Sequence, residues 1–172
     1  MLQDDTADAA LTTIVLADDH VVVRHGLRLV LEGEDDLRVV AEAGDVADAM
    51  RYVRAHRPSV LVLDLNMPGE PSLPAIPRFL EGSPGTAIVV LTMQDDPAFA
   101  REALRAGALG YVLKEAADDE LVEAVRAAGR GDTYLNPRLG ARQDPEFGMP
   151  GSALYHRDCF VEGQPTSPLS SA

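Results

Sequence analysis

Short apolar runs alternate with longer segments of helical period along most of this chain. TTIVLA (12–17) and SVLVLDL (59–65) are rich in β-branched residues, whereas apolar residues between such runs recur every three or four positions. Strands that are apolar on both faces are typical of a parallel sheet covered by helices on both sides. The pattern therefore predicts a doubly wound α/β fold of five strand-helix repeats, with a five-stranded parallel sheet in the order 2-1-3-4-5.

The bounds of the expected elements follow from the same two periodicities. The helix near Leu73 to Leu80 should be short or displaced, because Pro74 suits a first turn while Pro77 removes an amide donor from the helix. The expected strands cover 12–17, 37–43, 59–65, 86–92 and 109–114, and the other expected helices cover 20–33, 45–57, 96–107 and 118–131.

Charge and apolar content limit the function classes. The 172 residues are 46% hydrophobic, enough for one domain with a proper core. A net charge of −13, with 15 Lys and Arg against 28 Asp and Glu, argues against nucleic-acid binding by this chain. No basic leader is present and no apolar run approaches the roughly 18 residues of a membrane span, so we expect a cytoplasmic protein with no membrane partner. Cys159 is a single cysteine, which excludes an internal disulfide and a multi-cysteine metal site.

Polar residues end four of the expected strands. Asp18 and Asp19 follow the first strand, while Asp64, Thr92 and Lys114 end the third, fourth and fifth. The carboxyl ends of parallel strands share one edge of the sheet, so these side chains should face one pocket. Each alone has a structural explanation as a helix cap, a turn residue or a solvated lysine. Together, three carboxylates with a single lysine call for a metal ion and an anion.

The chemistry of this expected pocket is that of phosphoryl transfer. Carboxylate oxygens, with no cysteine or histidine expected beside them, favour Mg²⁺ or Mn²⁺, and Mg²⁺ commonly joins carboxylates to a phosphate. A metal ion, a lysine and a hydroxyl around one carboxylate would offset the charge of a phosphoryl group, which makes Asp64 the candidate nucleophile. The histidines lack metal-ligand spacing and are expected to be structural or exposed: His20, His25, His56 and His156.

Four motifs, LADDH, LVLDLNMPG, VVLTM and AGALGYVLK, occur in order on the expected strands. They resemble the response-regulator receiver domains of bacterial two-component systems, which have a flavodoxin-like fold, and the resemblance covers roughly residues 12–130. It implies that Asp64 accepts a phosphoryl group from a histidine kinase. It also implies that Asp19, Asp64 and the backbone carbonyl of Asn66 bind Mg²⁺, with Asp18 in support.

The same resemblance assigns the response to phosphorylation. It implies that Thr92 and Lys114 contact the phosphoryl oxygens and that Tyr111 is the switch aromatic, with phosphorylation drawing Thr92 and Tyr111 inward. His20 after the acidic pair, and Glu115 after the lysine, are most similar to the subgroup with a LuxR-type helix-turn-helix output. A homodimer is expected, and DNA is the expected partner of the full-length protein.

Two alternatives use the same residues. One is a stand-alone receiver that acts only through protein contacts. The other is a phosphatase of the haloacid-dehalogenase type, which also has an Asp nucleophile and Mg²⁺ but expects a second acid where this chain has Asn66. The segment MPGEPSLPAIP, with Ser72 in place of a second glycine, departs from the receiver pattern only in the third helix and its loop. We expect no enzymatic activity beyond self-phosphorylation and self-dephosphorylation.

Composition divides the chain into three parts. Residues 12–130 form the expected receiver domain, 131–142 a linker toward an output domain that this chain lacks, and 143–172 an irregular tail rich in Pro, Gly and Ser. The tail is expected to derive from a vector, since DPEF is typical of a restriction-site scar; a divergent native tail is the alternative. Its apolar anchors are Leu154, Tyr155, Phe160 and Val161.

Overall fold

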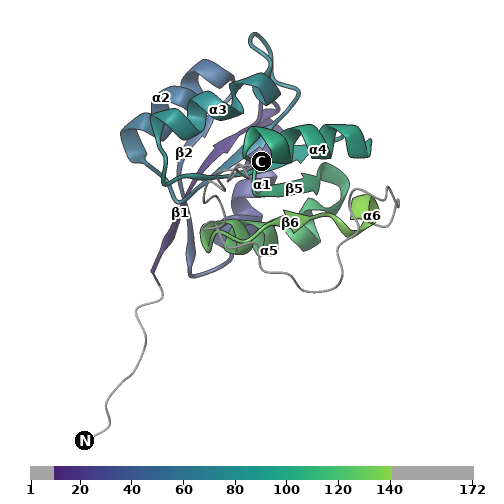
Figure 1. Cartoon of the computed structure of the whole chain (residues 1–172). Helices are drawn as coiled ribbons and strands as arrows, with labels where there is room; N and C mark the ends of the chain where they lie inside the picture. The colour runs from purple at the N-terminus through teal and green to yellow at the C-terminus, as the bar shows by residue number, and fades with distance from the viewer. Residues whose placement is uncertain (1–9, 141–172) are drawn as a thin grey trace, which may run out of the picture.

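The computed structural model describes residues 10–140 as a six-stranded parallel sheet between two layers of helices (Figure 1). The strand order is β2-β1-β3-β4-β5-β6, so the predicted doubly wound fold and the order of its first five strands are confirmed. The strands are β1 (Thr12–Ala17), β2 (Leu37–Ala43), β3 (Val60–Asp64), β4 (Ala87–Thr92), β5 (Gly110–Leu113) and β6 (Tyr134–Leu135). The helices are α1 (Val21–Glu32), α2 (Val46–His56), α3 (Ser72–Gly82), α4 (Pro97–Ala106), the 3₁₀ turn η1 (Lys114–Ala116), α5 (Ala117–Gly129) and α6 (Pro137–Gly140).

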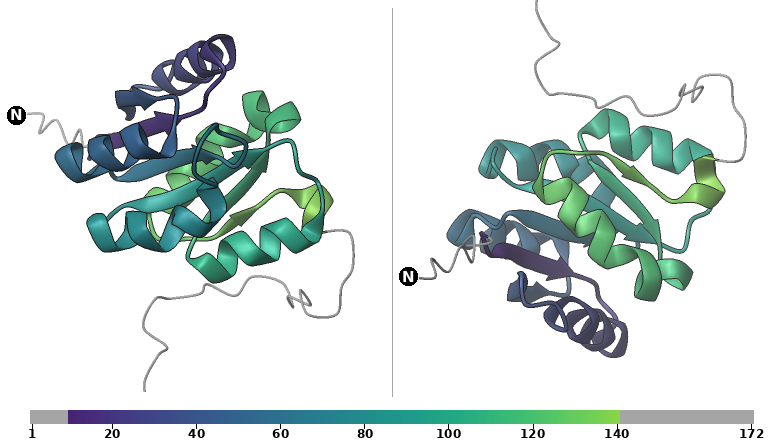
Figure 2. Two further views of the ribbon diagram at one scale, coloured as in Figure 1. Left: turned by 90° about the horizontal axis from the view of Figure 1, so that it is seen from above. Right: turned by 90° about the horizontal axis from the view of Figure 1, so that it is seen from below.

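Helices cover both faces of the sheet (Figure 2), and each face has its own apolar core. Helices α2, α3 and α4 cover one face, where Leu61 and Phe79 are fully buried. Helices α1 and α5 cover the other, around Leu31 and Leu121. Because β3 lies inside the sheet and is buried along its whole length, Asp64 at its carboxyl end is carried into the interior.

Helix α3 differs from its prediction. It runs for 11 residues, Ser72–Gly82, with Pro77 inside it, so the expectation of a short helix is wrong. Pro74 lies in the first turn, where a backbone N–H has no intrahelical partner, and only Pro77 costs the helix a bond, about 3 kcal/mol. Full burial of Ile76 and Phe79, about 1.5–3 kcal/mol each, offsets that cost.

The segment expected to be a linker adds an edge to the sheet. β6 pairs in parallel with β5, Gly110 beside Tyr134 and Tyr111 beside Leu135. The Asn136 N–H donates to the Tyr111 carbonyl at 3.1 Å, which extends the attachment by one residue. A strand of two residues is too short for any periodic signal, which is why the sequence pattern does not reveal it.

Asn136 fastens this edge to α5, and its replacement should loosen β6. The side chain is fully buried, and its Nδ2 donates to Glu120 Oε2 at 2.7 Å. Asn136→Ala should therefore destabilise the fold by about 1–2 kcal/mol, because a half-buried carboxylate loses a donor. Urea denaturation measures the loss, and hydrogen exchange at the Tyr134 amide should accelerate. Unchanged exchange at Tyr134 would contradict the assigned role.

The tail predicted for 143–172, with its apolar residues Leu154, Tyr155, Phe160 and Val161, lies outside the described residues. Within residues 10–140, no helix has the length and apolar content that crossing a bilayer requires.

Candidate functional site

The carboxyl ends of β1, β3 and β5 bring two acids and one lysine into direct contact. Asp18 follows β1, Asp64 is the last residue of β3, and both are fully buried. Lys114 begins η1 directly after β5, and its Nζ lies 2.7 Å from Asp18 Oδ2 and 2.9 Å from Asp64 Oδ2. The predicted convergence of these strand ends is therefore present in the structure.

Lys114 is held as a cation by these two carboxylates. Burial lowers the pKa of its ammonium, but the ion pairs with Asp18 and Asp64 outweigh burial, and the pKa lies above its ordinary value. Lys114 is also the only lysine in the chain; the other strongly basic side chains are all arginines. A compact ammonium can approach two buried carboxylates where a planar guanidinium would not fit in the same way.

The loop after β3 closes onto Asp64. The Asn66 N–H donates to Asp64 Oδ1 at 3.0 Å, so this carboxylate has one oxygen on the loop backbone and the other on Lys114. Gly69 has a φ of 86°, a left-handed conformation that glycine adopts without strain. The loop thus holds the backbone of Asn66 beside the acidic cluster.

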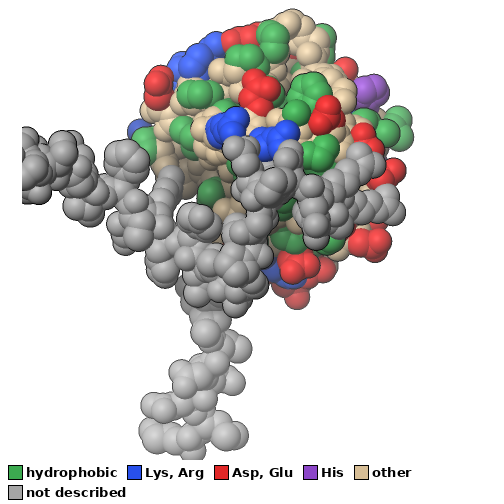
Figure 3. Space-filling model, turned by 45° about the vertical axis from the view of Figure 1, so that its right-hand side comes forward, with side chains coloured by type: hydrophobic (Ala, Val, Ile, Leu, Met, Phe, Trp, Pro, Cys, Tyr) green, Lys and Arg blue, Asp and Glu red, His purple; other side chains and the backbone are tan. Residues whose placement is uncertain are grey.

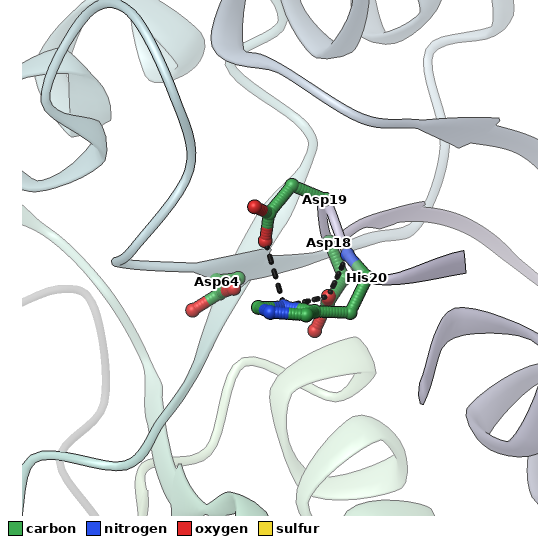
Figure 4. A group of neighbouring side chains, drawn as sticks. All are labelled: Asp18, Asp19, His20 and Asp64. Carbon is green, nitrogen blue, oxygen red and sulfur yellow. Dashed lines mark hydrogen bonds and ion pairs between the residues drawn. The ribbon is translucent and has the colours of Figure 1, made fainter. Parts of the chain in front are cut away.

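Asp19 and His20 complete the acidic cluster, which Figure 4 shows with Asp18 and Asp64. The ligand atoms of these four side chains all lie within 4.8 Å of one another. The His20 N–H donates to Asp18 Oδ1 at 2.8 Å, and its Nδ1 is 2.9 Å from Asp19 Oδ1. The expectation that no histidine lies beside the carboxylates is therefore wrong, because the turn from β1 into α1 points the imidazole back toward them.

This donor set fits a divalent cation. Two of its buried oxygens, Asp18 Oδ2 and Asp19 Oδ1, have no hydrogen-bond donor among residues 10–140. Each lies close to a nitrogen, Lys114 Nζ and His20 Nδ1, but these are ion-pair distances whose directions do not make hydrogen bonds. Buried carboxylate oxygens that lack donors are the hard ligands that Mg²⁺ and Mn²⁺ prefer.

Thr92 and Tyr111 meet at the backbone of Gln94. Thr92 Oγ1 accepts the Gln94 N–H at 3.1 Å, and the Tyr111 hydroxyl donates to the Gln94 carbonyl at 2.9 Å. Thr92 and Tyr111 are both fully buried. Tyr111 is thus already turned inward in this structure.

A cavity of about 230 Å³ opens beside these residues at the ends of β4 and β5. Lys114 and Thr92 among its lining residues carry hydrogen-bond donors of the kind that an anion needs, whereas Asp95 and Glu115 add negative charge to the same lining. Its lining consists of Thr92, Met93, Asp95, Leu113, Lys114 and Glu115.

Burial of Tyr111 makes the fold sensitive to alkali. Desolvation, reinforced by the charges of Asp96 and Asp95, raises the pKa of Tyr111 to about 12 from 10.0. The pKa of Tyr111 is higher in the folded chain than in the unfolded chain. The stability that its neutral hydroxyl contributes is therefore complete below pH 10 and falls between pH 10 and 12. The loss should reach about 2–3 kcal/mol. In urea denaturation across this range, Tyr111→Phe should show a shallower decline than the wild type; parallel curves would contradict this.

Comparisons with known proteins agree with the fold and with this site. Residues 14–126 match the model of the response regulator receiver domain. The oxygen regulatory protein NreC of Staphylococcus carnosus is 46% identical over 135 residues, which are 78% of this chain and 62% of that protein. A LuxR-family two-component response regulator from Aurantimonas is 36% identical, with a TM-score of 0.73 over 76% of this chain and 94% of that one.

A third relative has been solved with nucleic acid. RcsB, in a structure of two dimers bound to two parallel DNAs, is 29% identical, with a TM-score of 0.70 over 76% of this chain and 67% of that one. The chain belongs to the response regulator receiver domain family, and its relatives place it with the type found in NreC and LuxR-family regulators. These homologues are signalling proteins. The match spans less than two thirds of the length of NreC.

Proposed function

We propose that this chain is a phosphorylation-driven switch in which Asp64 receives a phosphoryl group from a histidine kinase. The observation that carries the proposal is the contact of one ammonium, that of Lys114, with two fully buried carboxylates at the carboxyl edge of the sheet. A structural ion pair needs one acid. The surplus of buried negative charge supports a site that takes a metal ion and an anion.

In the proposed transfer, a carboxylate oxygen of Asp64 attacks the phosphorus of a phosphohistidine. The new O–P bond forms as the P–N bond breaks, and the imidazole of the kinase leaves with the electron pair of that bond. Lys114 offsets negative charge on the phosphoryl oxygens. The product is an acyl phosphate, which water can hydrolyse to reset the switch.

Mg²⁺ or Mn²⁺ is the proposed cofactor. Asp18, Asp19, Asp64 and the backbone carbonyl of Asn66 would hold it, supported by the two buried oxygens without donors. A divalent ion there supplies positive charge that offsets the oxygens of the incoming phosphoryl group.

The structural change caused by phosphorylation would pass from the site to the rest of the domain through Thr92, Gln94 and Tyr111. A phosphoryl oxygen that engages the Thr92 hydroxyl competes with the Gln94 N–H now bonded to it, and Gln94 also holds the Tyr111 hydroxyl. Tyr111 in turn holds Asn136 through its carbonyl. Phosphorylation would shift the population between two arrangements of this link. The attachment of β6 to β5 would then change together with the position of Tyr111.

We further propose a homodimer in the cytoplasm, and a full-length protein that regulates transcription through a DNA-binding output domain beyond the segment 131–142. The RcsB dimers on DNA and the LuxR-family relative support the output. The chain given is not proposed to bind DNA itself, since its net charge is −13.

Intact mass spectrometry tests the proposal. After incubation with acetyl phosphate and Mg²⁺, we expect one added phosphoryl group that hydroxylamine removes, because acyl phosphates react with that nucleophile. Omission of the divalent ion should nearly abolish the addition. A stable adduct, or the same yield in EDTA, would contradict the proposed chemistry.

A further inference from the structure

His20 lies among the acidic side chains although nothing in the local fold requires it there. It is the N-cap residue of α1, yet its side chain makes no capping hydrogen bond. The imidazole is instead directed at the carboxylates, with Nδ1 2.9 Å from Asp19 Oδ1 and 3.5 Å from Asp18 Oδ1 (Figure 4). The side chain is 63% exposed, so the interior does not force it into this position.

The contact between His20 and Asp19 is incomplete as it stands. Asp19 Oδ1 is a buried atom without a hydrogen-bond donor among the described residues, even though Nδ1 lies at hydrogen-bond distance. The contact is an ion pair only if the imidazole is protonated, whereas an imidazole with its proton on Nε2 sets two lone pairs 2.9 Å apart and gains little from the contact. A third group placed between them would satisfy both.

We propose that His20 Nδ1 is a ligand of the metal ion, which makes this site selective for borderline divalent ions such as Co²⁺ and Zn²⁺ over Mg²⁺. The proposal rests on the metal site of the proposed function. With its proton on Nε2, the neutral imidazole presents the Nδ1 lone pair to the carboxylate cluster. Imidazole favours Zn²⁺ and neighbouring transition metals, whereas a set of oxygens alone suits Mg²⁺.

A purely positioning role for His20 predicts a different outcome. If His20 only orients the Asp19 carboxylate, removal of His20 weakens the binding of every divalent ion by a similar factor, because each ion uses the same oxygen. If Nδ1 is a ligand, removal of His20 lowers the affinity for ions that bind imidazole well and leaves the affinity for Mg²⁺ nearly unchanged. The ratio of the two affinities separates the roles.

The test is calorimetric titration of Mg²⁺ and Co²⁺ at one slightly alkaline pH. His156→Ala and Cys159→Ser form the background, so that these two side chains cannot take Co²⁺. In that background, His20→Ala should weaken Co²⁺ binding at least about tenfold and change Mg²⁺ binding less than about threefold. His25→Ala, an exposed histidine on the same helix, is the matched control and should change neither affinity.

A spectroscopic reading accompanies the titration. Addition of Zn²⁺ should shift the ¹⁵N resonance of His20 Nδ1 and leave that of His25 in place, because only coordination acts directly on the nitrogen lone pair. If His20→Ala lowers the affinity for both ions equally, or if the Nδ1 resonance does not shift, the assignment of His20 as a ligand is wrong. The proposed metal site itself would not be affected by that result. Absence of Mg²⁺ binding in the background protein would overturn the metal site, and the assignment with it.

Discussion

Asp64→Asn should abolish phosphorylation by acetyl phosphate, so that no addition is detectable in the intact mass. The amide nitrogen and oxygen of asparagine form no acyl phosphate, and the site also loses one negative charge toward Mg²⁺. The change nearly conserves volume, so the fully buried position should tolerate it. Circular dichroism should match the wild type.

The matched control for this variant is Asp35→Asn, an exposed acid remote from the sheet edge. It should be phosphorylated as the wild type is. Normal phosphorylation of Asp64→Asn would show that another side chain accepts the group, and the assignment of Asp64 would then be wrong.

Lys114→Met removes the cation between Asp18 and Asp64 and should give the largest loss of stability at the site. Two fully buried carboxylates then lack the ammonium that contacts both. Removal of one partner from a buried ionic cluster typically costs about 3 kcal/mol or more, so urea denaturation in EDTA should show a loss of this order.

Mg²⁺ should restore much of this stability, because an ion that binds only the folded chain stabilises it by mass action. Lys114→Arg keeps the charge and should lie between the wild type and Lys114→Met. A Lys114→Met protein as stable as the wild type in EDTA, with no response to Mg²⁺, would mean that the carboxylates do not depend on this lysine.

The fold could be predicted because its first five strands are mostly apolar runs separated by segments of helical period, and this alternation specifies a parallel sheet whatever the loops contain. Asp18, Asp64 and Lys114 could be predicted for the same reason: each follows a run whose end is unmistakable, and topology brings those ends together. The burial of Ile76 and Phe79, which keeps α3 helical through Pro77, depends on tertiary packing that local rules do not contain.

Two features of the site escape sequence reasoning for physical reasons of their own. His20 directly follows Asp18 and Asp19 in the sequence, but its side chain faces them only because of the turn from β1 into α1, and Asp64 approaches it only through the sheet. The attachment of Asn136 to Tyr111 requires β6, a strand too short to leave a pattern.

We propose that a phosphoryl group on Asp64 changes the hydrogen-bonded link from Thr92 through Gln94 to Tyr111 and β6. The measurement is a ¹H–¹⁵N correlation spectrum of the chain with Mg²⁺, before and after addition of acetyl phosphate, with Asp64→Asn as the unphosphorylated reference. We predict shifts of the Gln94, Tyr111 and Asn136 amides in the wild type, because these backbone groups share the hydrogen bonds of the link.

Thr92→Ala should still gain a phosphoryl group by mass, while the shifts at Tyr111 and Asn136 become much smaller, since the hydroxyl that couples them to the site is gone. Shifts confined to the neighbours of Asp64 in the wild type, or shifts at Tyr111 and Asn136 that are equally large in Thr92→Ala, would contradict the account.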